Sequence, residues 1–313
     1  MNCPDVSVVI PLYNKAPYIK RTIDSVLSQT IHNFEILIVG GNSTDGGEDI
    51  VLGYSDSRIR FVKEKGKGVS SARNQGVNSA RTELIAFLDA DDEWKPEHLE
   101  TILKLQNDFP EAGVFGTGYQ MITTQKKYSR VLHPEKGDRF LKSYFEERVK
   151  AGIQNQFLLT SAVAVNKSLF LNIGGFDTSL VVGEDLDLYE RLAIHSGIAY
   201  SPVISVIYHN ELPNNTRYLV RSLPPIKWDN IDRLCVEVKS KSNDKLSGCL
   251  QYAEMMYSSI GFGNAIRGYK KESMTVWKKV KLTRYPIVRL VSYILNVLPN
   301  CMRKKIMDFW YEL

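Results

Sequence analysis

Short apolar runs and amphipathic stretches alternate along the first part of the chain. Runs rich in β-branched residues predict strands at 6–12, 34–39, 59–62 and 84–88. Apolar residues at helical spacing predict a helix at 16–29, and another helix is expected at 69–79. Ser43 or Thr44 is the expected N-cap of another helix that ends near Val51. This alternation predicts an α/β fold with a doubly wound, mostly parallel sheet, in which ligands bind beyond the carboxyl ends of the strands.

The pattern is less regular further on. Pro96 is expected to begin a helix that runs to about residue 107, and the pair Glu184–Asp185 is expected to open another. Further strands are predicted at 113–123, 159–165 and 205–209, whereas 124–156 has no clear pattern. The proline-rich stretch 213–225 is typical of a linker or an ordered loop, and only helical patterns follow it. We therefore expect a domain of residues 1–212 and a helical, basic extension of residues 213–313.

The composition excludes several classes of protein. Of the 313 residues, 43% are hydrophobic and 24% are charged, which is typical of globular proteins and not of disordered or collagen-like ones. The four cysteines are widely scattered, so we expect neither a disulfide framework nor a cysteine metal site, and a reducing, cytoplasmic location is favoured. No apolar run is long enough to span a membrane. The N-terminus carries Asp5 and lacks a basic region, unlike a signal peptide.

The net charge of +5 is unevenly distributed. Residues 266–313 contain eleven Lys or Arg and three Asp or Glu, a charge of +8, which subtracted from +5 leaves −3 for the rest of the chain. The basic character belongs to the C-terminal region, so nucleic-acid binding by the whole protein is not expected.

Three carboxylates follow directly on the predicted strand 84–88, in the run Asp-Ala-Asp-Asp at 89–92. Clustered like charges repel and resist burial, so packing alone does not favour this run. A divalent cation would relieve the repulsion, because Mg²⁺ takes one or two protein carboxylates and completes its shell with phosphate oxygens and water. The alternative is an acidic turn before the next helix.

Two more segments place chemistry at predicted helix starts. The run 183–187 (Gly-Glu-Asp-Leu-Asp) offers a carboxylate that could take a proton from a hydroxyl, although acidic residues here also complement the helix dipole. The glycine-rich run 66–74 brings Lys67, Arg73 and backbone N–H groups to a helix start, where they could hold phosphates. A surface loop is the alternative, and the spacing matches neither a P-loop nor a dinucleotide-binding motif.

The first predicted strand ends in Pro-Leu-Tyr-Asn at 11–14, where a ligand crevice would open and Tyr13 could stack on a base. Together, and in this order, five motifs resemble glycosyltransferase family 2 of the GT-A fold. They are V-S-V-V-I-P-L-Y-N, S-T-D-G, G-V-S-S-A-R-N, F-L-D-A-D-D, and G-G-F-D followed by G-E-D-L-D-L. The resemblance covers roughly residues 5–210, about two thirds of the chain.

The resemblance implies a Rossmann-like GT-A sheet and an inverting transferase that takes a sugar from a nucleotide-diphosphate donor. It implies that Asp89 and Asp91 hold Mg²⁺ or Mn²⁺ against the diphosphate, with Ala90 between them in the donor site. The general base is expected to be Asp185, with Glu184 in support.

The resemblance also implies a nucleoside pocket lined by Pro11, Tyr13 and Asn14, and it places Arg73 near the donor phosphates. In GT-A enzymes a late histidine sometimes completes the metal shell, and the segment after it folds over the donor. His209 is the candidate for the first role, and residues 211–217 are the candidate for the second, with Arg217 on a phosphate. A partly buried histidine without such a role is the alternative.

One motif departs from the family pattern. The family usually has V-D-D-G-S-T-D after the second strand, whereas this chain has glycine at both aspartate positions, Gly40 and Gly41. The second of those aspartates typically bonds the nucleobase, so recognition of the base is in doubt. Asn42 is expected to substitute in part, because its amide offers a donor and an acceptor.

Residues 286–299 combine an apolar stripe with a face that contains Arg289, Ser292 and Asn296. Basic residues flank this stretch on both sides, and Trp277 and the aromatic residues at 309–311 add candidate interfacial rings. Such a pattern suits a helix on a membrane surface. The alternative is a helix packed on the catalytic domain with a solvated basic face.

The leading hypothesis is transfer of a sugar to a hydroxyl of a glycan or lipid-linked acceptor in polysaccharide biosynthesis, in the cytoplasm or on the inner face of the cell membrane. Two alternatives remain. Because Gly40 and Gly41 replace the two family aspartates, one alternative is a protein that binds a nucleotide sugar without catalysing its transfer. A nucleotidyltransferase would also use an acidic metal site, although the separate Glu184–Asp185 pair argues against it.

Overall fold

The computed structural model describes residues 3–152, 155–211, 228–240, 244–281, 285–303 and 305–306. The chain divides into two compact units, one of Met1–Tyr144 with Asn155–Leu212 and one of Phe145–Gln154 with Pro213–Leu313. The later boundary coincides with the expected one at residue 212. The segment 145–154 differs from the expectation, because it belongs to the second unit, where the ring of Phe145 lies 5.4 Å from that of Tyr252.

The first unit is built on a mixed sheet whose N-terminal half is parallel, in the order β3-β2-β1-β4. These strands are β1 (Val6–Pro11), β2 (Phe34–Gly40), β3 (Ile59–Lys63) and β4 (Leu84–Phe87). Nearly every residue of β1, β2 and β4 is buried, as expected for strands covered on both faces. The predicted α/β fold with a mainly parallel central sheet is confirmed.

The second half of the sheet adds antiparallel strands that the sequence pattern does not indicate. Here β9 (Val163–Asn166) runs antiparallel between β4 and β6 (Ala112–Ile122), and β6 pairs in parallel with β10 (Gly197–His209). The short strands β5 (Glu93–Trp94), β7 (Lys127–Arg130) and β8 (Arg139–Leu141) pair antiparallel with β10, β6 and β10. A hydrophobic run predicts a strand but not its direction, which the connections decide.

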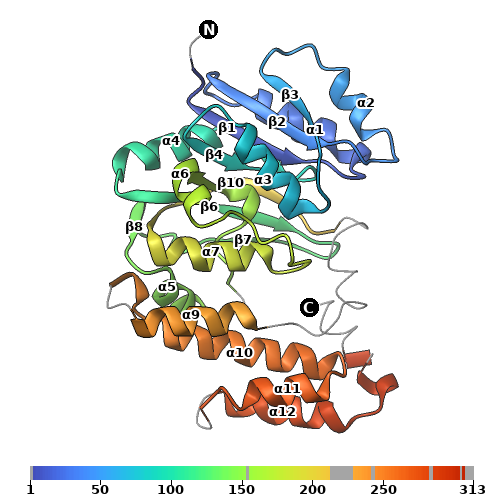
Figure 1. The fold of residues 1–313 in the computed structure, drawn as a ribbon, viewed down its shortest axis with the longest axis vertical. Coiled ribbons are helices and arrows are strands. Elements are labelled where there is room, and N and C mark those ends of the chain that lie inside the picture. The colour runs from blue at the N-terminus through green and yellow to red at the C-terminus, as the bar shows by residue number, and fades with distance from the viewer. Residues whose placement is uncertain are drawn as a thin grey trace. The chain divides into compact units, whose positions relative to one another are not determined.

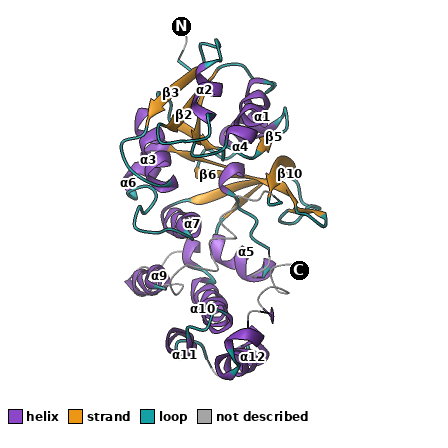
Figure 2. Ribbon diagram, turned by 90° about the vertical axis from the view of Figure 1, so that its right-hand side faces the viewer, coloured by secondary structure: helices purple, strands orange, loops and turns teal. Residues whose placement is uncertain are grey.

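Helices cover both faces of this sheet. Figure 2 shows α1 and α4 on one face and α3 and α6 on the other. The helices of this unit are α1 (Ala16–Leu27), α2 (Gly47–Leu52), α3 (Val69–Ser79), α4 (His98–Asp108), α6 (Lys167–Asn172) and α7 (Glu184–His195). A single 3₁₀ turn, η1 (Thr160–Ala162), precedes β9.

Two predicted helix starts are wrong. The helix α2 begins at Gly47 after Gly46, whose φ of 84° suits glycine, and the N–H of Gly47 donates to Asp45 Oδ1 rather than to Ser43 or Thr44. Ser43 and Thr44 instead bond to Asn14, which turns the loop before the helix back toward β1.

The other wrong start is that of α4. This helix begins at His98, and Pro96 lies in the turn before it. The carbonyl oxygen of Pro96 accepts a hydrogen bond from the N–H of Thr30, so a contact with the end of α1 holds Pro96 outside the helix.

The second unit is helical, as predicted. Its helices are α5 (Tyr144–Ala151), α9 (Asp229–Ser240), α10 (Cys249–Ile266), α11 (Lys270–Trp277) and α12 (Pro286–Val297), with a 3₁₀ turn η3 (Asp244–Leu246). The first residue of α5, Tyr144, is assigned to the first unit. Both α11 and α12 pack on α10 (Figure 1). The predicted linker 213–225 and the aromatic residues 309–311 lie outside the described residues.

The expected role of Trp277 as an interfacial ring is wrong. Its side chain is 1% exposed, and it packs so closely on Gly261 that a Cβ there would lie 2.8 Å from its indole nitrogen. Across the part of the chain that the structure describes, no helix has the length and apolar character needed to cross a membrane.

Candidate functional site

A turn of residues 89–92 follows β4 at the carboxyl edge of the sheet. Because β4 pairs with β1 in parallel, this turn and the residues after Pro11 leave the sheet at the same edge. Leu88 is fully buried, whereas the side chains of Asp89 and Asp91 are 30% and 16% exposed. Ala90, expected in the donor site, is 2% exposed and belongs to the hydrophobic core. The turn therefore presents two carboxylates at the edge.

Each of these carboxylates has a cationic partner. Lys15 Nζ donates to Asp91 Oδ2 at 2.5 Å, and Arg73 Nη2 donates to Asp89 Oδ1 at 2.5 Å. Arg21 adds a third contact, because its guanidinium donates to the carbonyl oxygen of Asp91. The clustered negative charge is thus balanced by basic side chains from α3 and from the start of α1.

The third carboxylate of the run, Asp92, points inward and is 1% exposed. Its Oδ2 accepts a hydrogen bond from Ser161 Oγ at 2.5 Å, and its Oδ1 accepts one from the N–H of His209 at 3.1 Å. Burial and the nearby charges of Asp91 and Asp89 raise the pKa of Asp92 well above its usual value. Asp92 therefore cross-links η1 and β10. Unlike Asp89 and Asp91, it does not present its carboxylate to a ligand at the edge of the sheet.

Arg73 joins the two acidic segments. Its guanidinium is buried, lies 5.1 Å from the ring centre of Phe176, and donates from Nη1 to Glu184 Oε1 at 3.2 Å as well as to Asp89. Burial disfavours the cation, but the charges of Asp89 and Glu184 outweigh burial and raise the pKa of Arg73. Arg73, which the resemblance places near the donor phosphates, contacts both carboxylates in this structure.

The helix α7 begins directly after Gly183, whose φ of 82° glycine adopts without strain. Glu184 and Asp185 are half-buried in its first turn, and Asp185 Oδ1 accepts the N–H of Leu186 at 2.8 Å. Burial raises the pKa of Asp185, and burial together with the charge of Asp185 raises that of Glu184. A raised carboxyl pKa suits proton transfer closer to neutral pH.

The residues after β1 hold the loop that follows β2. Asn14, at a φ of 50°, accepts the N–H of Thr44 at 2.8 Å on its side-chain oxygen. Its own N–H donates to Ser43 Oγ. Tyr13 is 61% exposed beside this loop, and Pro11 is the last residue of β1. An exposed ring at the carboxyl edge of β1 is free to stack on a base.

The two glycines that replace the family aspartates occupy positions that do not easily accept a side chain. Gly41 has a φ of 140°, and a Cβ at Gly40 would lie 3.0 Å from the carbonyl oxygen of Leu12. Asn42 Nδ2 donates to Glu64 Oε2 at 3.1 Å, and the other oxygen of Glu64 is buried without a hydrogen-bond partner among the described residues. The carboxylate beside this loop therefore belongs to Glu64, the residue directly after β3, and not to a residue at the end of β2.

Two other predicted residues, Lys67 and His209, make no hydrogen bond or ion pair with either exposed aspartate of the turn in the described part of the chain, although the N–H of His209 donates to Asp92. Lys67 is exposed in the loop before α3. His209 is 7% exposed, with Nε2 at 2.6 Å from Glu93 Oε1 and Nδ1 at 2.7 Å from Glu211 Oε1. Because both ring nitrogens contact carboxylates, His209 offers no free nitrogen to a metal in this arrangement. Arg217, predicted to reach a phosphate, lies outside the described residues.

The exposed carboxylates can be compared with the needs of a divalent cation. Among the described residues, no group of three or more His, Cys, Asp or Glu side chains is arranged to hold a metal ion. Mg²⁺ needs fewer protein ligands when phosphate oxygens and water complete its shell. Asp89 and Asp91 are the two exposed carboxylates of this turn, and each is paired with a cation, Arg73 or Lys15, with which a bound metal ion would compete.

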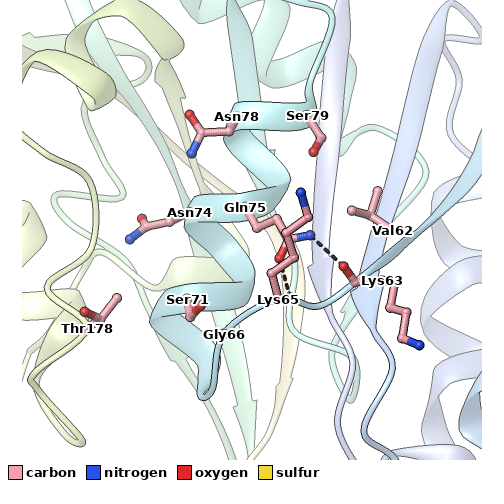
Figure 3. A pocket seen from close by; sticks show the side chains of 10 residues that line it. All are labelled: Val62, Lys63, Lys65, Gly66, Ser71, Asn74, Gln75, Asn78, Ser79 and Thr178. Atoms are coloured by element: carbon pink, nitrogen blue, oxygen red, sulfur yellow. Dashed lines mark hydrogen bonds between the residues drawn. The ribbon is translucent and has the colours of Figure 1, made fainter.

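A separate open cavity of about 760 Å³ lies beside α3. Gln75 shapes it by accepting the N–H of Lys65 and donating to the carbonyl oxygen of Lys63 (Figure 3). Its lining also contains Ser71, Asn74, Asn78 and Thr178, and includes neither exposed aspartate. The cavity is therefore distinct from the acidic edge.

The family is decided by comparison with known proteins. Residues 7–174, more than half of the chain, match the family model described as glycosyl transferase family 2. The chain belongs to glycosyl transferase family 2. A relative from Rickettsia typhi, described as an uncharacterized glycosyltransferase, is 34% identical over 201 residues, which are 63% of this chain and 61% of that protein. The chain thus spans about three fifths of that relative.

Two solved structures of proteins in complex with sugar nucleotides share the fold. Residues 1–349 of TarS from S. aureus, in complex with UDP-GlcNAc, match with a TM-score of 0.67 and 14% identity, over 93% of this chain and 88% of that one. A mannosyltransferase from Pyrobaculum calidifontis, in complex with GDP-Man and Mn²⁺, matches with a TM-score of 0.60 and 16% identity, over 100% and 89%. The fold of this family 2 chain is therefore GT-A, as predicted.

Sequence reasoning missed Lys15, Arg21 and Ser161 at the acidic edge. Lys15 follows the Pro-Leu-Tyr-Asn motif directly, and its place after a parallel strand next to β4 is a signal that could have paired it with Asp91. Ser161 carried no such signal. It accepts the N–H of Asp89 and donates to Asp92, and only the antiparallel placement of β9 brings it there.

Proposed function

We propose that this chain transfers a sugar from a nucleotide-diphosphate donor to an acceptor hydroxyl, in a single displacement that inverts the anomeric carbon. The observation that carries the proposal is the buried Arg73 bridge, which joins Asp89 at the end of β4 to Glu184 at the start of α7. This bridge supports the proposal, because it links the carboxylate proposed to act on the donor side to the residue directly before Asp185, the proposed base. Membership of the family and the sugar-nucleotide complexes of the two structural neighbours support the same reaction.

Asp185 is the proposed general base. One of its oxygens accepts the N–H of Leu186, which fixes the orientation of the carboxylate in the first turn of α7. Burial raises its pKa, so the carboxylate has a greater affinity for the hydroxyl proton than an exposed aspartate has. Removal of this proton as the new bond forms would increase the nucleophilicity of the acceptor oxygen.

Asp89 and Asp91 would hold Mg²⁺ or Mn²⁺, and the bound ion would offset the charge that develops on the departing diphosphate. The protein's own cations have a related role. Lys15 neutralises Asp91 in this structure, and its ammonium group is near enough to the acidic edge to donate to a phosphate oxygen. Charge stabilisation of this kind accelerates transfer to the extent that it is greater in the transition state than in the bound donor.

Replacement of Asp91 by alanine should reduce turnover by about 100-fold or more, because a transition-state charge contact of several kcal/mol is lost. Release of sugar from the donor in the presence of Mn²⁺ measures this effect. Asp108→Ala is the matched control, since Asp108 is exposed on α4 and pairs with Lys104. Equal turnover of Asp91→Ala and the control would show that Asp91 takes no part in the reaction.

The nucleobase that the donor carries can be identified by measuring which nucleotide stabilises the protein most. We expect one of UDP, GDP, CDP or dTDP to raise the thermal midpoint more than the others, and to do so more strongly with Mn²⁺. At a ligand concentration of 100 times Kd the gain is about 2.7 kcal/mol. Glu64→Gln should alter the ranking, because this carboxylate lies beside the loop where the family aspartates are missing. No stabilisation by any of the four would contradict a nucleotide site here.

The proposed acceptor is a hydroxyl on a glycan or a lipid-linked glycan, used at the inner face of the cell membrane. A second candidate, a binding protein without catalysis, is motivated by Gly40 and Gly41. Slow donor hydrolysis without acceptor separates the two, because an active site transfers sugar to water at a low rate and an inactive one does not.

A further inference from the structure

The helix α12 exposes most of its apolar side chains and buries its polar ones, together with a single apolar residue, Leu295. Arg289, Ser292 and Asn296 are at most 7% exposed. A helix on the surface of a globular protein normally has the opposite arrangement. The exposed apolar side chains of α12 are Ile287, Val288, Leu290, Val291, Tyr293, Ile294 and Val297.

Hydrogen bonds hold the helix in this orientation. Arg289 donates from Nη2 to the carbonyl oxygens of Trp277 and Val280, and its guanidinium lies 5.1 Å from the centre of the Trp277 ring. Asn296 donates to Ser273 Oγ, which itself donates to the carbonyl oxygen of Gly261. Rotation of α12 to bury its apolar face would break these hydrogen bonds and leave the carbonyl oxygens of Trp277 and Val280 without this donor.

The segments of the chain that precede and follow α12 are rich in basic residues. Lys278 and Lys281 before α12 and Lys305 after it are exposed. From residue 266 to the end of the chain, eleven basic residues accompany three acidic ones. The helix of 12 residues is about 18 Å long. It is therefore suited to lie along a surface and too short to cross a bilayer.

We propose that α12 docks on an anionic lipid surface, with its exposed apolar side chains among the acyl chains and the flanking lysines at the headgroups. An anionic bilayer complements both features, since it offers apolar depth and negative charge together. A second copy of this chain fits less well, because a symmetric contact through the same face would bring two basic regions together. This docking does not depend on the transfer reaction.

Flotation of the full chain with phosphatidylcholine vesicles, with and without phosphatidylglycerol, tests the proposal. We expect binding only when phosphatidylglycerol is present, and weaker binding as the salt concentration rises. Ile294→Glu should weaken binding at least about tenfold. Lys278→Gln and Lys281→Gln should each weaken it about fivefold.

Val236→Glu is the matched control, because Val236 is also an exposed apolar residue of a helix in this unit, 69% exposed on α9. The Val236→Glu variant should bind vesicles like the unmodified chain.

Donor hydrolysis and the thermal midpoint of each variant are measured alongside, and both should match those of the unmodified chain because the substituted side chains are exposed. Absence of binding to anionic vesicles would overturn the proposal, as would equal binding by Ile294→Glu and Val236→Glu. Concentration-dependent dimers of the unmodified chain that Ile294→Glu abolishes, without vesicle binding, would assign the face to a second copy instead.

Discussion

Asp185→Asn should lose sugar transfer while it keeps donor binding and gains stability at neutral pH. The amide cannot accept the proton of the acceptor hydroxyl, so the rate should fall by about 100- to 10,000-fold. Its side-chain oxygen can still accept the N–H of Leu186, as Asp185 does. Initial rates of transfer and calorimetric titration of the donor measure the two effects separately.

The stability gain has a defined pH dependence. Burial raises the pKa of Asp185 in the folded chain above its ordinary value of 3.8, so the folded state binds this proton more tightly than the unfolded state. Ionisation therefore destabilises the fold as the pH rises from about 3.8 to the raised pKa, and the penalty stays constant above it. Urea unfolding should show Asp185→Asn as the more stable protein at neutral pH, with the difference vanishing in acid.

Asp108→Asn serves as the control, because this exposed side chain on α4 lies outside the acidic edge. It should change neither transfer nor stability measurably. Wild-type transfer by Asp185→Asn would assign the base to another group, of which Glu184 is the nearest along the chain.

Arg73→Met should give the largest loss of stability. The buried guanidinium neutralises Asp89 and Glu184, and its removal leaves both carboxylates without this partner. Breaking a buried ion pair by removal of one member costs about 3–5 kcal/mol, which urea unfolding would detect as a lower free energy of unfolding. Donor hydrolysis should fall as well, because the two acidic segments would repel each other.

Arg73→Lys should retain part of the stability but not all of it. A lysine keeps the charge, whereas its single ammonium group cannot donate as a fork to both carboxylates. Lys104→Met, at an ion pair whose lysine side chain is 57% exposed, is the control and should leave stability almost unchanged. A loss below about 1 kcal/mol in Arg73→Met, the size of an ordinary substitution, would show that the bridge is not a major source of stability.

Much of the framework follows from local sequence patterns. The helix α3 was predicted at 69–79 and is found at Val69–Ser79, because its glycine before the start and its apolar spacing are local signals. The parallel strands β1 to β4 were likewise predicted, since buried strands of a parallel sheet are continuous apolar runs. The acidic run after β4 and the acidic start of α7 were found in the same way. Their proposed chemical roles stay predictions.

Distances across the fold could not be read from these patterns. Arg73 is 16 residues from Asp89 and 111 from Glu184 in the chain, and only the packing of α3 beside both segments unites them. For the same reason, one of the three neighbouring carboxylates, Asp92, was not recognised as an inward cross-link to Ser161. Salt-bridge and hydrogen-bond partners are chosen by proximity in space, which a sequence pattern does not contain.

The sequence by itself determined the family motifs, the parallel start of the sheet, the helical character of the second unit and the amphipathic pattern of α12. Only the tertiary structure decided that β9 runs antiparallel, that Arg73 bridges two acidic segments and that α12 turns its polar side inward. Periodicity shows that a helix has two unlike faces. Which face is buried depends on the hydrogen bonds that neighbouring elements offer, and here α11 and the residues after it offer carbonyl oxygens to Arg289.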